Sequence, residues 1–126
     1  MMYRNDDNVH YLFSALVVGS FFTENINEGA KASEIGDEIT LKRERYNKFD
    51  KKAVAVYNHR GIKLGYITRH QNTAVANIMD SGMVSECFGI IQSLDKRRTS
   101  VGMLASIYYV CEEKDYIKII YIIQRS

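Results

Sequence analysis

The chain has 126 residues, of which 46% are hydrophobic and 25% are charged, a composition typical of one folded domain and not of a disordered chain. Its formal net charge of +2 is too small to identify a nucleic-acid-binding protein by itself. No apolar run approaches the roughly 18 residues of a membrane span, and no secretory segment is present, so we expect a cytoplasmic protein without membrane contact.

The N-terminal part of the sequence predicts a tail followed by a strand. Residues 1–10 are polar and lack periodicity, which indicates a flexible tail, and residues 11–126 then form a single domain. The first strand is predicted at residues 11–19 and continues through residues 20–23. Residues 25–36 are a polar, glycine-containing connection that is longer than most loops.

Three short strands are predicted next. Residues 39–43 alternate apolar and polar side chains, residues 53–57 are an apolar run rich in strand-forming residues, and residues 62–66 alternate again. Turn residues 58–61 join the last two strands as a hairpin, in which Gly61 supplies the positive φ angle of a tight turn. The loop between the first two of these strands is therefore exposed.

A helix is predicted after this hairpin. Thr68 and Gln71 have the spacing of a capping box, so the helix is expected to begin at Thr68. Gly82 stands where a left-handed C-terminal cap belongs. The apolar face that packs on the sheet is predicted to comprise Ala74, Val75, Ile78 and Met79.

The remaining sequence predicts three more strands, at residues 83–94, 103–111 and 116–123. The basic turn 96–98 and the charged turn 112–115 separate them. Seven strand segments with short connections around one helix indicate a small antiparallel barrel, because a parallel sheet would need a helix at each crossover.

Both cysteines lie within the predicted strands. Cys87 and Cys111 each occupy an apolar run, and neither has the spacing of a C-x-x-C motif. We therefore predict buried free thiols in a reducing compartment instead of a disulfide or a redox pair.

The loop before the strand at residues 53–57 concentrates positive charge. Between residues 42 and 52 six basic residues face two acidic ones, which gives a local charge of +4. Such a run is often only a solvated surface, but a basic loop that also holds aromatic residues has the composition of a single-strand binding groove. Both interpretations stay open on composition alone.

Aromatic residues in or near this loop also allow either a structural or a binding interpretation. Phe49 and its neighbour Tyr46 lie among charged residues, where they could stack on bases, or where Phe49 could fold back to plug the end of the barrel. Phe21 and Phe22 are adjacent, so on a strand one of them must point away from the core.

These residues also carry a family resemblance. The ordered pattern comprises Gly36-Asp37, Arg43-Glu44, Asn47-x-Phe49-Asp50-x-x-Ala53-Val54-x-Val56 and Gly61-x-x-x-Gly65-Tyr66-Ile67, followed by a helix. Over residues 15–110 the chain resembles a HIRAN domain. The resemblance implies a mainly β fold, an OB-like small antiparallel β-barrel of about six strands with one or two α-helices packed against it. Barrels of this kind commonly bind oligonucleotides.

The resemblance implies a function as well, because HIRAN domains of fork-remodelling DNA translocases grip the 3′ end of single-stranded DNA. The implied DNA-binding residues here are Phe21, Phe22, Asn47, Lys48, Phe49, Asp50 and Arg69. The rings would contact the terminal bases, Asp50 would accept a hydrogen bond from the terminal 3′-hydroxyl, and Arg69 would meet a backbone phosphate near a helix N-terminus. Lys48 would help to attract phosphate.

The sequence departs from the family pattern at several places. Ser20 replaces a basic residue before the aromatic pair, and phenylalanines replace the family's tyrosines. The chain has no proline, and Lys48 and Thr68 stand where the family often has one. One phosphate contact is therefore lost, and the loop is expected to be more mobile.

No motif predicts catalysis, a metal or a cofactor. The three histidines are scattered, and no G-x-S-x-G, Walker or dinucleotide pattern occurs. Asp6, Asp7 and His10 could approach a metal, but they lie in the predicted tail without a partner cluster.

We therefore predict a non-enzymatic module for single-stranded DNA with a role in DNA repair or replication-fork processing. Any helicase or nuclease partner would be a separate chain. The alternative is a protein-interaction module that keeps the barrel and has lost its ligand. Ser20 and the modest net charge favour this alternative, which predicts that the aromatic rings pack inward.

Overall fold

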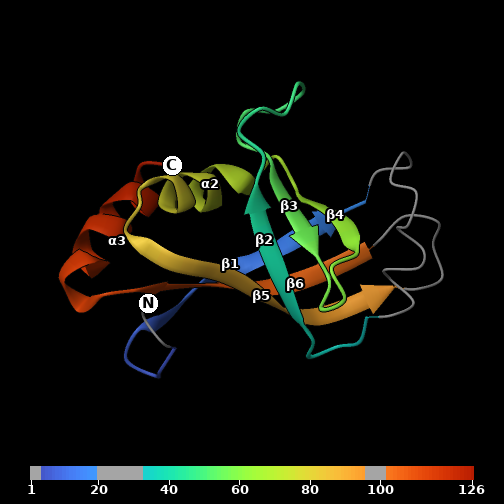
Figure 1. Cartoon of the computed structure of the whole chain (residues 1–126), viewed down its shortest axis with the longest axis horizontal. Helices are drawn as coiled ribbons and strands as arrows, with labels where there is room; N and C mark the ends of the chain where they lie inside the picture. Colours follow the sequence, from blue (N-terminus) through green and yellow to red (C-terminus); the bar gives the residue numbers. More distant parts are fainter. Residues whose placement is uncertain (1–3, 20–32, 96–101) are drawn as a thin grey trace.

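A computed structural model describes residues 4–19, 33–95 and 102–126 of the chain. Within these ranges six antiparallel strands close into a barrel in the order β1-β4-β3-β2-β5-β6, with β6 pairing back onto β1 (Figure 1). The strands are β1 (Val9–Val18), β2 (Glu38–Arg43), β3 (Val54–Tyr57), β4 (Lys63–Ile67), β5 (Val84–Asp95) and β6 (Gly102–Cys111). The predicted antiparallel barrel of about six strands is confirmed.

Two α-helices lie beside the long β5–β6 hairpin, α2 (Asn72–Asp80) and α3 (Tyr116–Gln124), and the short 3-10 helix η1 (Glu113–Asp115) precedes α3. Helix α2 packs on both α3 and β5. Neither helix is long and apolar enough to cross a bilayer, and the same holds for every helix in the described part of the chain.

The core fills the barrel and continues under the helices. In β2 the alternation is the predicted one, since Ile39 and Leu41 are buried while Thr40 and Lys42 face water. Strand β3 is buried on both faces because one face lines the barrel and α2 approaches the other. The largest fully buried side chains include Tyr109, Ile39, Leu64, Ile67, Ile78, Ile91, Met103, Ile107 and Ile119.

The prediction of a seventh strand at residues 116–123 is wrong, because this segment is helix α3. Its many isoleucines favour a strand by local propensity. However, Ile119, Ile122 and Ile123 also recur at helical spacing, and the structure packs all three against the barrel core. Burial of this helical face overrides the local preference.

The predicted start of the first helix is also wrong, since α2 begins at Asn72 and no side chain caps it. The Gln71 amide instead accepts a hydrogen bond from the Leu16 N–H and donates one to the Ser14 carbonyl, both 2.9 Å long. Strand β1 pairs with β4 only at Val17 and Val18. Gln71 therefore satisfies backbone hydrogen-bonding groups in the part of β1 that does not pair with β4.

The C-terminal end of α2 agrees with its prediction. Gly82 has a φ angle of +73°, the left-handed conformation expected at this position. Of the predicted apolar face, Val75 and Ile78 are fully buried, whereas Ala74 and Met79 are only partly buried. Ala76 is fully buried in addition.

The N-terminal residues were expected to form a flexible tail through residue 10, but Val9 and His10 pair with β6 as part of β1. The Arg4 guanidinium bonds to both Glu38 and Glu86, and it lies 3.6 Å from the centre of the Phe88 ring. The flexibility of the residues before β1 stays a prediction.

Cys87 and Cys111 are buried free thiols, as predicted. Burial raises the pKa of Cys87 to about 12, and the neighbouring Glu86 carboxylate adds to this rise. Neither sulfur is therefore poised to react as a thiolate.

A carboxylate network joins the loop after β2 to strand β4. Glu44 accepts hydrogen bonds from the Lys63 ammonium (2.9 Å), the Asn47 amide (3.0 Å) and the Tyr66 hydroxyl (2.9 Å). Burial alone would raise the pKa of Glu44, but these three donors outweigh it and lower the pKa. Folding therefore favours the ionised carboxylate.

The role of α3 can be tested with two isoleucines of the same helix. Ile119→Ala should lower the free energy of unfolding by about 2–5 kcal/mol, because it opens a cavity in the core. Ile117→Ala, at an exposed position, should change it by less than about 0.5 kcal/mol. Urea denaturation measures both values, and equal effects would contradict the packing of α3.

The Glu44 network predicts an acid dependence of stability. Because the pKa of Glu44 is lower in the folded chain, its contribution is present above the unfolded value near 4.5 and disappears as the pH falls through the folded value. Glu44→Gln should lower the free energy of unfolding at pH 7 by up to about 1 kcal/mol and flatten its decline as the pH falls below the unfolded value near 4.5.

Urea denaturation at a series of pH values measures this decline. Glu113→Gln, at an exposed position, is the control and should keep the wild-type pH dependence. A Glu44→Gln variant with the wild-type pH dependence would show that the network does not stabilise the fold.

Candidate functional site

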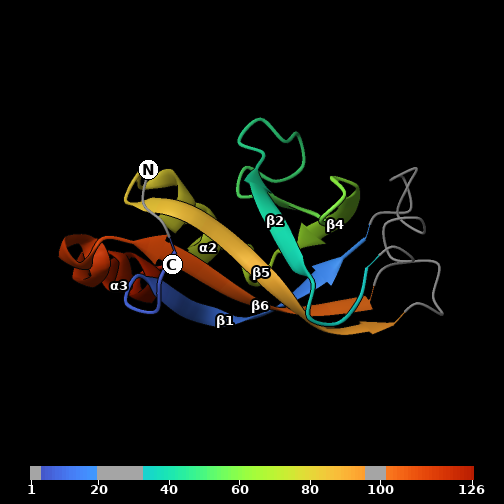
Figure 2. The same cartoon turned by 60° about the horizontal axis from the view of Figure 1, so that its bottom comes forward.

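The β2–β3 loop, residues 44–53, stands clear of the barrel in both views (Figures 1 and 2). Its conformation is fixed from within, because the Asn47 side-chain oxygen accepts hydrogen bonds from the Phe49 N–H (2.9 Å) and the Asp50 N–H (3.0 Å). The Asp50 carboxylate in turn accepts one from the Lys52 N–H at 2.9 Å. These side-chain-to-backbone bonds order the loop without the proline that the family often has here.

A pocket of about 550 Å³ lies where this loop meets the end of β1, strand β4 and the start of α2. We call it the Phe49 pocket. Its lining residues are Val18, Asn47, Phe49, Asp50, Ala53, Tyr66, Ile67, Arg69 and Asn72. The structure thus brings together four of the predicted site residues from two separate segments of the chain.

Phe49 is 85% exposed although it belongs to the wall of this pocket. The alternative in which its ring plugs the end of the barrel is therefore wrong. A phenyl ring left in water is available to stack on a planar ligand.

The side chains of Asp50 and Arg69 differ in how exposed they are to solvent. The Asp50 side chain is 21% exposed and accepts a 2.7 Å hydrogen bond from the Asn72 amide, whereas the Arg69 side chain is 68% exposed. Arg69 donates to the Phe49 carbonyl at 2.6 Å, and its Nε lies 3.7 Å from the Asp50 carboxylate. The pocket therefore has a carboxylate inside and a guanidinium at its rim.

The other predicted site residues are placed differently. Lys48 is exposed on the β2–β3 loop and does not line the Phe49 pocket. Phe21 and Phe22 lie outside the described residues, as do Ser20 and the basic turn at residues 96–98. Their predicted roles stay predictions.

Sequence reasoning did not assign Asn72, Tyr66 or Glu44 to the site. Asn72 is almost fully buried as the first residue of α2, where its amide holds Asp50. Tyr66 belongs to the Gly61-x-x-x-Gly65-Tyr66-Ile67 pattern, but only the fold shows that its hydroxyl donates to Glu44. The sequence signal that could have indicated these residues is a loop with two carboxylates, Glu44 and Asp50, which need hydrogen-bond donors from other elements.

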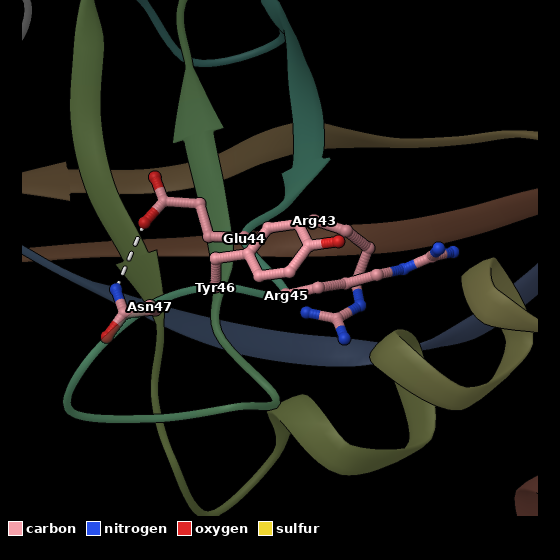
Figure 3. A pocket seen from close by; sticks show the side chains of 5 residues that line it. All are labelled: Arg43, Glu44, Arg45, Tyr46 and Asn47. Carbon is pink, nitrogen blue, oxygen red and sulfur yellow. Dashed lines mark hydrogen bonds between the residues drawn. The ribbon is translucent and has the colours of Figure 1, made fainter.

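A second cavity, of about 580 Å³, lies on the loop beside Tyr46 (Figure 3). We call it the Tyr46 pocket, and its lining residues are Arg43, Glu44, Arg45, Tyr46 and Asn47. The Asp80 carboxylate on α2 accepts a pair of 3.0 Å hydrogen bonds from Arg43 and another 3.0 Å bond from the Nε of Arg45. Hydrogen bonding to Arg43 lowers the pKa of Asp80.

The groups that gather at the two pockets are aromatic and charged side chains. Within the described ranges, no three His, Cys, Asp or Glu side chains gather closely enough to hold a metal ion. The two pockets gather two exposed aromatic rings, the guanidinium groups of Arg69 and Arg45, and the partly buried carboxylates of Asp50 and Glu44.

Several solved structures resemble the chain. A protein from Lactobacillus plantarum is 28% identical with a TM-score of 0.75, and the match covers 82% of this chain and 97% of that chain. The crystal structure of the HIRAN domain of human HLTF is 17% identical with a TM-score of 0.69, covering 96% and 94% of the two chains. The NMR structure of the HLTF HIRAN domain in its DNA-bound conformation is 15% identical with a TM-score of 0.58, covering 95% and 93%.

The last two likenesses are too low in identity to show more than the fold. No curated protein matches the sequence. A family model described as the HIRAN domain matches residues 10–110. These residues include the β2–β3 loop, α2 and all of the barrel except Val9 and Cys111. The chain therefore belongs to the HIRAN domain family.

Proposed function

We propose that this chain is a non-enzymatic module that binds single-stranded DNA at a free 3′-hydroxyl end. The observation that carries the proposal is the Phe49 pocket, in which an exposed aromatic ring, a partly buried carboxylate and a rim guanidinium lie within one ligand-sized space. Each of these groups matches one part of a terminal nucleotide.

The exposed ring matches the base. Stacking of a base on an aromatic side chain contributes roughly 1–3 kcal/mol and tolerates any base. Asn47 holds the backbone of Phe49 and Asp50 in place before a ligand arrives. Little loop entropy is then lost on binding, which favours affinity.

The carboxylate matches a hydroxyl at the end of the strand. Asp50 accepts donors from Asn72 and Lys52, but two carboxylate oxygens have about four acceptor sites, so a terminal hydroxyl can still donate to it. A terminal phosphate in the same place would be repelled. Arg69, further out, suits the phosphate that precedes the terminal nucleotide.

Basic side chains around the pocket support electrostatic attraction. Three basic side chains are exposed on the β2–β3 loop: Arg45, Lys48 and Lys51. Binding should therefore weaken as salt rises, by a log–log slope of about −0.7 per neutralised phosphate.

The wider role rests on family membership. The HLTF HIRAN domain has been solved in a DNA-bound conformation and shares the fold of this chain. We extend the proposal to DNA repair or replication-fork processing, in the cytoplasm, alongside a separate helicase or nuclease chain. Phe21 and Phe22 would supply further stacking if the family pattern holds.

The competing function is a protein-interaction module whose barrel has lost its ligand. It predicts that the aromatic rings pack inward, and the exposure of Phe49 counts against it. The DNA-binding tests below separate the two functions.

End recognition can be tested with two matched oligonucleotides. Fluorescence anisotropy at low and moderate salt should show tighter binding to a strand with a 3′-hydroxyl than to the same strand with a 3′-phosphate. Asp50→Asn removes the repelling charge and should reduce this discrimination. Equal binding of both strands by the wild-type chain would refute end recognition, and no binding at low salt would refute the DNA-binding proposal.

Stacking can be tested at Phe49. Phe49→Ala should weaken binding of the 3′-hydroxyl strand by about 1–3 kcal/mol, whereas Phe49→Tyr keeps a ring and should bind nearly as well as wild type. Tyr121→Ala, at an exposed aromatic position on α3, is the matched control and should leave binding unchanged. An unaffected Phe49→Ala variant would remove this ring from the interface.

A further inference from the structure

We propose that Tyr46 and Arg45 form a second base-and-phosphate subsite, so that the β2–β3 loop holds two successive parts of one single strand. The inference rests on the proposed function and goes beyond it, because it gives the bound strand a path out of the Phe49 pocket.

Packing within the fold does not explain the position of Tyr46. Its side chain is 98% exposed, and Tyr46 and Phe49 are the two most exposed of the large hydrophobic residues in the described part of the chain. They lie three positions apart in the same ordered loop. A ring fully in water, so close to another, is better explained by a ligand that covers both than by packing.

The two pockets share a lining residue. Asn47 lines both the Tyr46 pocket and the Phe49 pocket, so the two spaces adjoin the same side chain. Three residues span at most about 10 Å of chain, and the hydrogen bond from the Asn47 N–H to the Glu44 carbonyl tightens this part of the loop. A short stretch of single strand can bridge such a distance.

The two arginines of the Tyr46 pocket are not equivalent. Arg43 is only 9% exposed, and its guanidinium also donates to the carbonyls of Ala53 (2.7 Å) and Lys51 (3.1 Å). Arg45 is 61% exposed and meets Asp80 through Nε alone. Among the described residues nothing bonds to its two terminal nitrogens, so they are available to a phosphate.

Asp80 orients Arg45 but does not neutralise both Arg43 and Arg45. One carboxylate serves two guanidinium groups, so a single positive charge is left over next to Tyr46. Figure 3 shows the Arg45 and Tyr46 side chains together on the loop. A guanidinium held at Nε presents its two outer nitrogens to a phosphate in a fixed direction.

The arrangement repeats a single motif. Phe49 has Arg69 bonded to its carbonyl, and Tyr46 has Arg45 next to it in the chain. A ring with a guanidinium, occurring twice across a shared wall, matches the repeating base and phosphate of a single strand. An acidic peptide would need the positive charges but not the two exposed rings.

The test compares two ligands of different length by NMR titration of the isotope-labelled chain. A thymidine dinucleotide with a 3′-hydroxyl fills the Phe49 pocket only, and a six-nucleotide oligothymidylate reaches the Tyr46 pocket as well. Tyr46→Ala should weaken hexanucleotide binding about 5- to 150-fold and leave dinucleotide binding unchanged. Phe49→Ala should weaken both, Tyr46→Phe should bind both as wild type does, and Tyr121→Ala is again the control.

Arg45 adds an independent readout. Arg45→Gln should weaken hexanucleotide binding and reduce its salt slope by about one phosphate contact, with no change for the dinucleotide. A glutamate-rich octapeptide serves as a competitor. If it displaces the hexanucleotide from wild type and does not bind Tyr46→Ala, the pocket belongs to a protein partner and the subsite proposal is wrong.

The possible failures are distinguishable. If wild type binds both oligonucleotides, Phe49→Ala weakens them and Tyr46→Ala does not affect the hexanucleotide, the second subsite is refuted while the proposed function stands. Equal weakening of both ligands by Tyr46→Ala would also refute it, since the ring would then act on the Phe49 pocket. If wild type binds neither oligonucleotide, the proposed function itself fails.

Discussion

The geometry of the site depends on the Glu44 carboxylate. It is tied to β4 through Lys63 and Tyr66, and it holds the amide nitrogen of Asn47. The oxygen of the same amide then holds the backbone N–H groups of Phe49 and Asp50. One chain of hydrogen bonds thus runs from the barrel wall to the backbone of the two residues that carry the ring and the carboxylate of the pocket, and it ties the surface loop to the sheet.

This arrangement assigns stability and the proposed recognition to different parts of the molecule. The six strands close into a barrel that buries a continuous core, so the barrel supplies the folding free energy. The loop buries little and displays rings and charges that a purely structural loop would avoid. Function placed on a loop above a rigid scaffold is a common division in proteins, and here the scaffold reaches into the loop through polar contacts.

Local chemistry predicted much of the fold. Gly61 and Gly82 have the positive φ angles that their turn and cap positions require, and the alternation in β2 placed Ile39 and Leu41 inside. Segment 116–123 could not be assigned this way, because a run of isoleucines suits a strand or a buried helix equally until its packing partner is known. Within the site, the family pattern identified Asn47, Phe49 and Asp50, whereas the bond from Asn72 to Asp50 joins segments that sequence alone does not bring together.

Helix α3 has a consequence for where this domain ends. The segment that the family model matches stops at residue 110, yet Ile119 belongs to the same apolar core and α3 packs on α2. Helix α2 begins with Asn72, which holds the pocket carboxylate. A chain cut at residue 110 would therefore retain every residue of the Phe49 pocket and still lose the helix that packs on α2, so the pocket depends on residues beyond the segment that lines it.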